Sequence, residues 1–270
     1  MIAFAGNSIL TRLALAPELI AADRFATLRV LSGVVTLWII VMIRRHRRGG
    51  ATPSRPDWRT VLALFVYLFG FSFAYETLDT GTGALILFGA VQLTMLGCGL
   101  YRGERLPALG WLGLAVATAG IVVLLAPGTT APEPWGAVLM LAAGIAWGVY
   151  SLVGGGGDPL GATAWNFLLA APLVIAVDLA ATSTGSEPAG IALAVASGSV
   201  ASGLGYVLWF AAREGLSASR AAAVQLTVPA IAALGGVILL AEPVTARLLL
   251  ASAATLGGVA VVLAARARKD

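Results

Sequence analysis

Charged residues are scarce in this chain of 270 residues, because Asp, Glu, Lys and Arg together make up only 11%. A soluble domain usually has about 25%, so this chain has too few charges to cover a water-facing surface. Disorder is also excluded, since disordered segments combine low hydrophobicity with high net charge. Here 59% of the residues are hydrophobic and the mean hydropathy is +0.92. These figures indicate an integral membrane protein.

Cysteine and histidine each occur once, as Cys98 and His46. A single cysteine cannot form an intramolecular disulfide, and a single histidine excludes most histidine-based metal sites. The chain has no nucleotide-binding motif that would indicate an ATP-driven pump. We therefore expect no cofactor, no metal site and no catalytic residues, and we do not expect an enzyme.

Basic residues give the chain a net charge of +4 and a pI near 9.7, values that could indicate a nucleic-acid partner. However, 16 of the 17 basic residues are arginines, and most of them lie in short clusters between apolar runs. This distribution is typical of membrane proteins. The expected surroundings are therefore membrane lipids, with no nucleic acid.

Apolar runs long enough to cross a bilayer, which takes roughly 20 residues, occur throughout the chain. The opening stretch, Ile2–Leu15, is shorter and contains Asn7 and Arg12. It could be a signal peptide, but no basic segment precedes it and Arg12 interrupts the apolar run, so we favour a slightly shortened first span. Nine further spans are predicted at 25–43, 60–78, 81–101, 107–126, 136–153, 161–181, 189–212, 220–241 and 246–264.

The basic residues also orient these spans, because Lys and Arg accumulate on the cytoplasmic side of a membrane. With ten spans and the N-terminus inside, the opposite loops hold only Arg24 and Arg247. The cytoplasmic segments hold thirteen basic residues, namely Arg44, Arg45, Arg47, Arg48, Arg55, Arg59, Arg102, Arg105, Arg213, Arg220, Arg266, Arg268 and Lys269. We therefore expect a multi-pass protein of the inner (cytoplasmic) membrane with both termini in the cytoplasm.

The two halves of the chain match each other without gaps at a shift of 138 residues, the spacing between Glu76 and Glu214. Glu104 and Glu242 match in the same register, and acidic residues are scarce enough to make both pairs informative. The register predicts five spans in each half. An odd number of spans inverts the second half relative to the first, which is typical of secondary transporters. Duplication that merely enlarged a helical bundle is the alternative. The halves are 1–128 and 129–270.

Several stretches resemble one known family. The sequence SGLGYVLWFAAREGLSASRAAAVQLTVPAIAALGGVILLAEPVTARL (202–248) is similar to the second half of EamA-like members of the drug/metabolite transporter superfamily. Three further segments resemble other landmarks of that family: FATLRVLSG (25–33), FGAVQLTMLGCGLYRGERL (88–106) and AAGIAWGVYSLVG (142–154). The resemblance implies an all-α membrane protein of ten transmembrane helices, arranged as two inverted five-helix repeats around a central cavity. It also implies movement of small metabolites, usually outward.

Polar and aromatic side chains lie inside several predicted spans, although hydrocarbon makes polar groups costly unless they face a cavity or the bundle interior. Amides suit polar or zwitterionic ligands, because they both donate and accept hydrogen bonds. Trp and Tyr offer flat apolar area and a cation–π face. The alternative is interhelical hydrogen bonding and core packing. For these residues taken together we favour a substrate-binding cavity, formed by Asn7, Gln92, Trp147, Tyr150, Asn166, Tyr206, Trp209 and Gln225.

Ionisable residues near the extracytoplasmic span ends are candidates for a gate or for proton coupling. Arg29 and Glu76 lie about one turn inside their spans, and a pair between them would lower the cost of burying each charge. Asp178 is the third candidate, because an apolar site raises the pKa of a carboxylate toward neutral pH. The alternative for these side chains is snorkelling to the interface.

Together these features predict a secondary transporter that exports amino-acid-like or amphipathic metabolites by alternating access. The partners are a small-molecule substrate, membrane lipids and, if transport is coupled, protons; the chain acts as a monomer or a homodimer. Facilitated uniport is an alternative within transport. A non-transporting membrane protein, either a sensor or scaffold or a lipid-modifying enzyme, is the alternative outside it, although the scattered amides do not form the convergent acid–base set that an enzyme needs.

Overall fold

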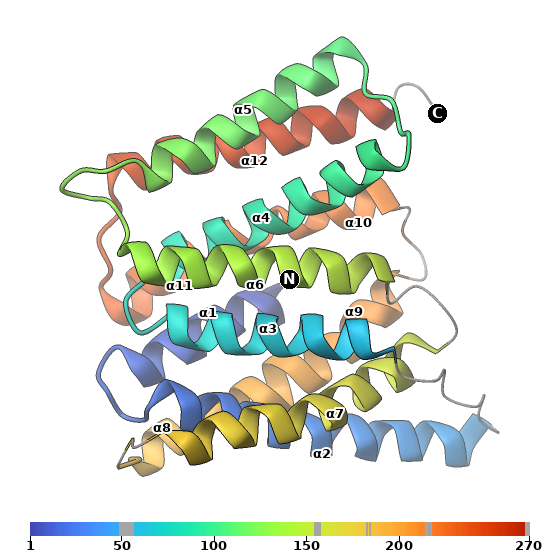
Figure 1. Ribbon diagram of the computed structural model, residues 1–270, viewed down its shortest axis with the longest axis vertical. Helices are drawn as coiled ribbons and strands as arrows, with labels where there is room; N and C mark the ends of the chain where they lie inside the picture. Colours follow the sequence, from blue (N-terminus) through green and yellow to red (C-terminus); the bar gives the residue numbers. More distant parts are fainter. Residues whose placement is uncertain are drawn as a thin grey trace.

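The structure of this chain is a computed structural model, which describes residues 1–48, 57–153, 158–181, 183, 185–213, 216 and 218–267. Helices lying roughly side by side make up nearly all of this part (Figure 1). They are α1 (Ile2–Leu15), α2 (Ala22–Arg48), α3 (Trp58–Ala74), α4 (Thr80–Tyr101), α5 (Ala108–Leu125), α6 (Pro134–Val153), α7 (Pro159–Ala180), α8 (Pro188–Ala196), the π-helix η1 (Ser197–Leu204), α9 (Gly205–Arg213), α10 (Ala218–Gln225), α11 (Thr227–Leu240) and α12 (Ala246–Ala267). Four residues used above lie outside the described residues: Arg55, Glu214, Arg268 and Lys269.

Eight helical segments of the described chain are long and apolar enough to cross a membrane. They are α2, α4, α5, α6, α7, α12 and the two composite helices α8–η1–α9 and α10–α11. Two shorter apolar helices, α1 and α3, complete the set. The prediction of an all-α membrane protein is therefore confirmed, and each predicted span corresponds to one of these segments.

Two predicted spans are interrupted. The span at 189–212 contains the π-helix η1 in its middle, and such segments are frequent at functional sites. The span at 220–241 is broken between Gln225 and Thr227. Pro229 follows this break, and because proline has no N–H it cannot donate the helical hydrogen bond to the carbonyl four residues earlier.

The interior of the bundle is formed by α1, α3, α4, α6 and η1. Here α3 and α4 pack on α6, while α1 packs on α11 and η1, and α2 lies against α7 and η1. The antiparallel pair α5 and α12 forms one outer edge of the bundle (Figure 1). This pair approaches closely at glycines: a Cβ added to Gly113 would lie 2.6 Å from the carbonyl oxygen of Gly258. Small residues permit such close packing between helices in lipid.

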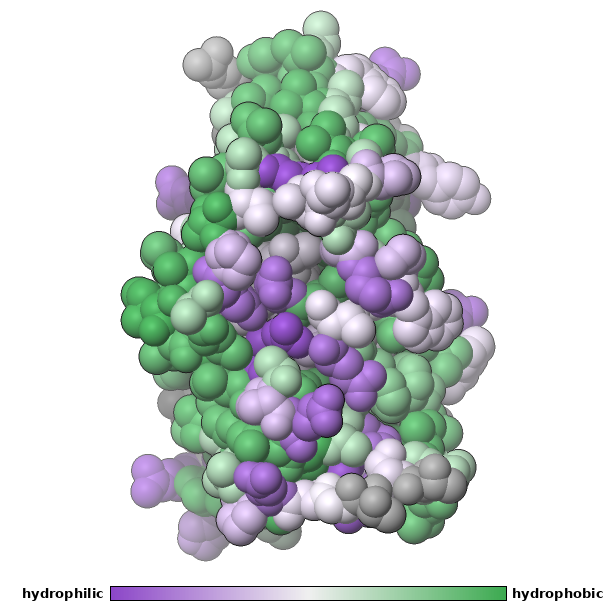
Figure 2. Space-filling view, turned by 90° about the vertical axis from the view of Figure 1, so that its left-hand side faces the viewer, coloured by the Kyte–Doolittle hydropathy of each residue, from purple (hydrophilic) through white to green (hydrophobic). Residues whose placement is uncertain are grey.

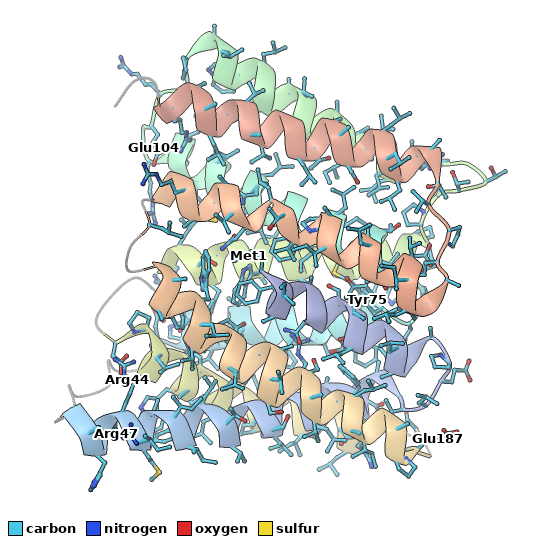
Figure 3. The ribbon with its side chains drawn as sticks, turned by 180° about the vertical axis from the view of Figure 1, so that it is seen from behind. Met1, Arg44, Arg47, Tyr75, Glu104 and Glu187 are labelled. Carbon is cyan, nitrogen blue, oxygen red and sulfur yellow. The ribbon has the colours of Figure 1, made fainter. Side chains whose placement is uncertain are left out.

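Charged residues separate to the two ends of the bundle. We call one the basic end, where Arg44, Arg47 and Glu104 lie (Figure 3), and the other the acidic end, where Tyr75 and Glu187 lie. Figure 2 views the acidic end, where hydrophilic side chains gather in the centre and hydrophobic ones flank them. This arrangement suits a bilayer, with polar helix ends at the interfaces and apolar flanks toward the lipid.

Candidate functional site

A small cavity lies between the two halves of the chain. Its wall comes from α1, α3, α4, α6 and α9, and it consists of Phe4, Asn7, Tyr67, Phe71, Leu87, Phe88, Trp147 and Tyr206. The cavity has a volume of about 10 Å³, which is room for about one water molecule. Aromatic rings fill most of the space, so a ligand larger than water must displace some of them.

The rings around this cavity contact one another. The ring centroid of Trp147 lies 4.9 Å from that of Tyr67, 5.6 Å from that of Tyr206 and 5.2 Å from that of Tyr150. Phe4 of α1 also contacts Tyr206, with the ring centroids 6.1 Å apart. Trp147 therefore connects α3, α6 and α9 through a continuous aromatic cluster.

Asn7 is held in the cavity wall by two serines of η1. Its Oδ1 accepts a hydrogen bond of 2.7 Å from Ser197, and its Nδ2 donates one of 3.2 Å to Ser202. The π-helical turn brings these two hydroxyls, five residues apart, to the same side chain. Asn7 is only 4% exposed, and its amide is satisfied within the protein.

Tyr150 and Asn166 lie next to the cavity in a buried polar network. Asn166 donates from Nδ2 to the Tyr150 hydroxyl at 3.3 Å and accepts from Thr60 at 3.1 Å. The Tyr150 hydroxyl also pairs with that of Thr163 at 3.1 Å. The network joins α3, α6 and α7 behind the stacked ring of Trp147, so these residues support the cavity wall without lining it.

The other three predicted cavity residues lie farther out. Gln92 is buried on α4 and donates to the carbonyl of Ala222 on α10, with a distance of 3.4 Å. Trp209 is half-buried and contacts Phe4, and Gln225 is half-buried at the end of α10. None of the three is part of the cavity wall described above.

Arg29 lies directly behind the cavity wall and is only 1% exposed. Its Nη2 donates to the Tyr67 hydroxyl at 3.2 Å, and its guanidinium carbon lies 4.6 Å from the ring centroid of Phe71. Its Nε and Nη1 have no hydrogen-bond partner among the residues that the structure describes. None of the ion pairs within the described chain includes this guanidinium.

The expected ion pair between Arg29 and Glu76 is wrong. Helix α3 ends at Ala74, so Glu76 lies exposed in the α3–α4 turn, whereas Arg29 points inward about two turns inside α2. Partial burial and the carboxylate of Asp23 raise the pKa of Glu76 above the usual glutamate value. Asp178, the third candidate, accepts hydrogen bonds from Arg24 Nε at 2.9 and 3.1 Å.

A different arginine joins the helices at the acidic end. Arg12 of α1 donates to the carbonyl oxygens of Tyr75 and Glu76 at 3.0 and 2.9 Å, and its Nε lies 3.4 Å from Glu242. Glu242 in turn accepts hydrogen bonds from the backbone N–H and the hydroxyl of Thr80. We call Arg12, Thr80 and Glu242 the acidic-end clamp. It ties α1, the start of α4 and the α11–α12 connection together.

The clamp makes a direct prediction about stability. Replacing Glu242 by alanine removes the acceptor at the N-terminus of α4 and a counter-charge of Arg12, so we expect a loss of about 2 kcal/mol. Thermal unfolding in detergent measures the change. Glu104→Ala is the matched control, because Glu104 precedes Glu242 by 138 residues in the chain but is half-exposed, and the ion pair it forms within the described residues, with Arg266, lies at the basic end. Equal loss of stability in both variants would contradict the clamp.

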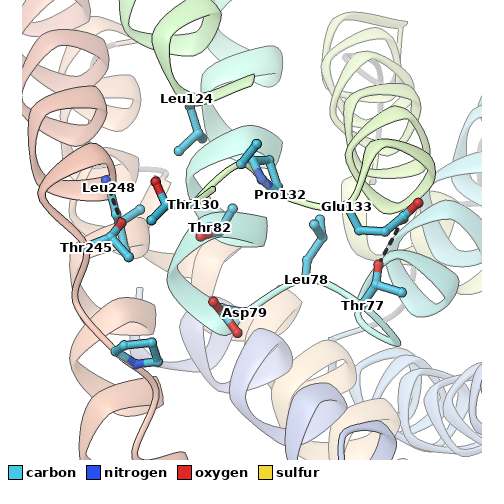
Figure 4. A pocket seen from close by; sticks show the side chains of 12 residues that line it. Thr77, Leu78, Asp79, Thr82, Leu124, Thr130, Pro132, Glu133, Thr245 and Leu248 are labelled. Carbon is cyan, nitrogen blue, oxygen red and sulfur yellow. Dashed lines mark hydrogen bonds between the residues drawn. The ribbon is translucent and has the colours of Figure 1, made fainter. Parts of the chain in front are cut away.

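A larger pocket opens at the acidic end itself (Figure 4). It has a volume of about 120 Å³ and lies between the start of α4, the α5–α6 connection and the start of α12. In its wall, Glu133 accepts a hydrogen bond of 3.3 Å from Thr77 and caps α6 through the N–H groups of Trp135 and Gly136. These hydrogen bonds lower the pKa of Glu133. The carboxylate is thus occupied in holding the helix start.

Comparison with known proteins places this architecture in a family. Residues 134–264 match the EamA-like transporter family. The chain is 51% identical to an uncharacterized protein of Pseudomonas aeruginosa, over 98% of this chain and 92% of that protein. The chain belongs to the EamA-like transporter family.

Other relatives of this EamA-like chain carry transporter names. An uncharacterized transporter of Archaeoglobus fulgidus is 26% identical over 93% of this chain and 90% of its own length. The uncharacterized inner membrane transporter YedA of Escherichia coli is 27% identical, over 48% of this chain and 42% of its own length. A protein known from a crystal structure has the same fold, with a TM-score of 0.68 at 22% identity, covering 98% of this chain and 97% of that one.

Sequence reasoning on this EamA-like chain missed most of the cavity wall. Asn7, Trp147 and Tyr206 were predicted, but five lining residues were not: Phe4, Tyr67, Phe71, Leu87 and Phe88. Four of the five have purely apolar side chains, and in an apolar helix such residues give no signal of which face they occupy. Tyr67 does carry a signal, because a tyrosine seven residues before the end of the apolar helix α3 needs a partner for its hydroxyl.

Proposed function

We propose that this EamA-like protein is a secondary transporter of the inner membrane that exports small amphipathic or amino-acid-like metabolites by alternating access. The observation that carries this proposal is the central cavity, because its wall combines side chains of both halves: Asn7, Tyr67 and Phe88 from the first, Trp147 and Tyr206 from the second. A site between two halves is the usual place for the substrate of a secondary transporter. The name of the related YedA supports the inner membrane as its location.

Packing between helices supports two inverted repeats, 1–128 and 129–270, as part of this proposal. The contact of α3 with α6 has its counterpart in the contact of α1 with α8 and η1, and the contact of α4 with α6 has its counterpart between α1 and α11. The contacts of α2 with α7, of α4 with α11 and of α5 with α12 each join two corresponding helices of the two halves, so exchanging the halves leaves these contacts unchanged. Two repeats that rock against each other would expose the cavity to each side in turn.

The two ends of the bundle support opposite roles in this cycle. In this proposal the acidic-end clamp closes the path on that side, because Arg12 joins α1 to the α3–α4 turn and to the α11–α12 connection. The excess of arginine at the basic end favours that end as the cytoplasmic one, with both termini inside. In this orientation the clamp must open before a compound leaves the cell.

Proton coupling has its best support at Glu76. Its pKa is raised by partial burial and by Asp23, so Glu76 takes up a proton at higher pH than a free glutamate. Any stability this protonation adds is present at low pH and is lost as the pH rises through the pKa of Glu76. Asp178 is less suited, because Arg24 already neutralises its charge.

Efflux from proteoliposomes tests the proposed function. We expect purified protein to release one compound class selectively from a pool of amino acids and other metabolites, compared with protein-free liposomes. An acidic outside should accelerate this release in the wild type and in Asp178→Asn, but not in Glu76→Gln. Equal rates with and without a pH gradient would indicate uniport. No selective release from folded protein would contradict transport and favour a scaffold.

A further inference from the structure

Arg29, next to the cavity, carries a buried positive charge that no ion pair within the described chain neutralises. Arginine stays protonated in proteins, and a buried charge without a partner is costly. The rings of Phe71 and Tyr67, at 4.6 and 5.6 Å from the guanidinium carbon, attract the charge. They do not replace hydrogen-bond acceptors for Nε and Nη1, which have none within the described part of the chain.

No carboxylate of the described chain fills this role. Its five ion pairs use Arg12, Arg24, Arg44 and Arg266 as the cations. Asp23 is buried on the same helix, but it lies six residues earlier, which is about 9 Å along the helix axis. The guanidinium therefore has N–H groups ready for an acceptor from outside the protein.

The position of Arg29 connects this charge to the cavity. Both residues that hold its guanidinium, Tyr67 and Phe71, line the cavity. Tyr67 also contacts Trp147, whose ring centroid is 4.9 Å away, so the charge and the aromatic cluster share one wall residue. A ligand that displaces these rings would meet apolar ring surfaces and an unpaired cation in the same space.

We propose that Arg29 binds a carboxylate of the transported compound while the apolar part of that compound packs against Trp147 and Tyr206. The inference rests on the proposed transport function and narrows its substrate class to organic acids and amino acids. Guanidinium and carboxylate form strong charge-assisted hydrogen bonds. The substrate would then supply the counter-charge of Arg29, so the protein with substrate bound would differ in free energy from the empty protein. A ligand needs such a difference to shift a conformational equilibrium.

The test uses proteoliposomes loaded with four probes that share one ring: phenylalanine, phenylacetate, phenylalaninamide and 2-phenylethylammonium, added to the amino-acid and metabolite pool. Rates are corrected for leakage from protein-free liposomes. We expect the wild type to release compounds with a carboxylate. In Arg29→Gln this release should slow at least tenfold, the loss of about 1.4 kcal/mol of binding, and Arg29→Lys should be intermediate because lysine keeps the charge but not the planar fork.

Two controls separate this role from a structural one. The first control is Arg44→Gln, because Arg44 lies on the same helix at the basic end and forms a half-exposed ion pair with Asp158. The release rate of this variant should stay within about twofold of the wild type, since exposed ion pairs contribute little. Removing an uncompensated buried charge should leave the melting temperature of Arg29→Gln unchanged or raise it. A clearly lower melting temperature would make Arg29 a structural residue and overturn the inference.

The outcomes also separate the inference from the proposed function. Selective release of only amides, amines or other compounds without a carboxylate would keep transport and overturn the role of Arg29. Release of carboxylates by Arg29→Gln at the wild-type rate would do the same. If the folded wild type releases nothing selectively, transport and the inference both fail.

Discussion

Replacing Trp147 by alanine is expected to slow selective efflux at least tenfold. The side chain is 9% exposed and its ring contacts Tyr67, Tyr150 and Tyr206. Its removal would take away the largest flat surface in the cavity wall and free the tyrosines on either side. We expect the efflux rate to fall by a factor of ten or more, since a buried aromatic contributes about 2 kcal/mol or more to a binding site. The proteoliposome assay measures this rate.

Stability must be measured beside activity in this variant, because large-to-small changes in a core cost about 3–5 kcal/mol. Trp147→Phe keeps an aromatic ring and is expected to fold with reduced but measurable efflux. Trp111→Ala is the matched control: Trp111 lies on α5, 54% exposed, away from the cavity. Efflux at the wild-type rate from folded Trp147→Ala would show that the cavity is not the substrate path.

Replacing Gly198 by alanine is expected to prevent stable folding. Gly198 lies in η1 against α2, and an added Cβ would collide with the Ser32 hydroxyl and with the backbone oxygen of Arg29. The backbone oxygen cannot rotate away, so η1 must move off α2. We expect a loss of about 3 kcal/mol or more, measured by thermal unfolding and by the yield of monodisperse protein in detergent.

A second glycine provides the opposite expectation. Gly97 lies in α4, and an added Cβ there meets nothing within 4 Å. Gly97→Ala should therefore stabilise the protein by about 0.5–1 kcal/mol, because alanine loses less backbone freedom in a helix than glycine. An equal gain in stability from Gly198→Ala and Gly97→Ala would contradict the close contact between η1 and α2.

Gly198 also links the fold to the cavity. The segment that needs this glycine carries Ser197 and Ser202, which hold Asn7, and it packs on α2 next to Arg29. A variant that folds with η1 displaced would therefore lose the orientation of Asn7. Efflux from any folded fraction of Gly198→Ala should be reduced as well.

Much of the fold could be predicted from the sequence, because the bilayer demands about 20 apolar residues for each span and satisfies backbone groups only within helices or closed barrels. The predicted spans at 81–101, 107–126 and 136–153 agree with α4, α5 and α6 within two residues at each end. The interruption at 189–212 could not be predicted, because a π-helical segment arises from packing and hydrogen bonds such as those between η1 and Asn7.

The candidate site was predictable only in part, for a physical reason. A polar or aromatic residue in an apolar span is visible in the sequence, and Asn7, Trp147 and Tyr206 were identified in this way. The face of a helix that such a residue occupies depends on the neighbouring helices, so the sequence does not reveal that Gln92 and Gln225 lie outside the cavity wall. Arg29 is visible in the sequence as a charge, but the expected pair with Glu76 is wrong, because α3 ends four residues before the predicted span does.

Hydropathy and charge act residue by residue along the chain, so the amino-acid sequence alone predicts an all-helical membrane protein, the positions of its helices and the helix ends that carry the arginines. That Arg12, and not Arg29, joins the helices at the acidic end follows only from the way the helices pack. Packing also sets Arg29 against aromatic rings, with no counter-charge among the described residues. Ion pairs and cavities depend on distances between helices that are far apart in the sequence, and those distances are set by packing at residues such as Gly198.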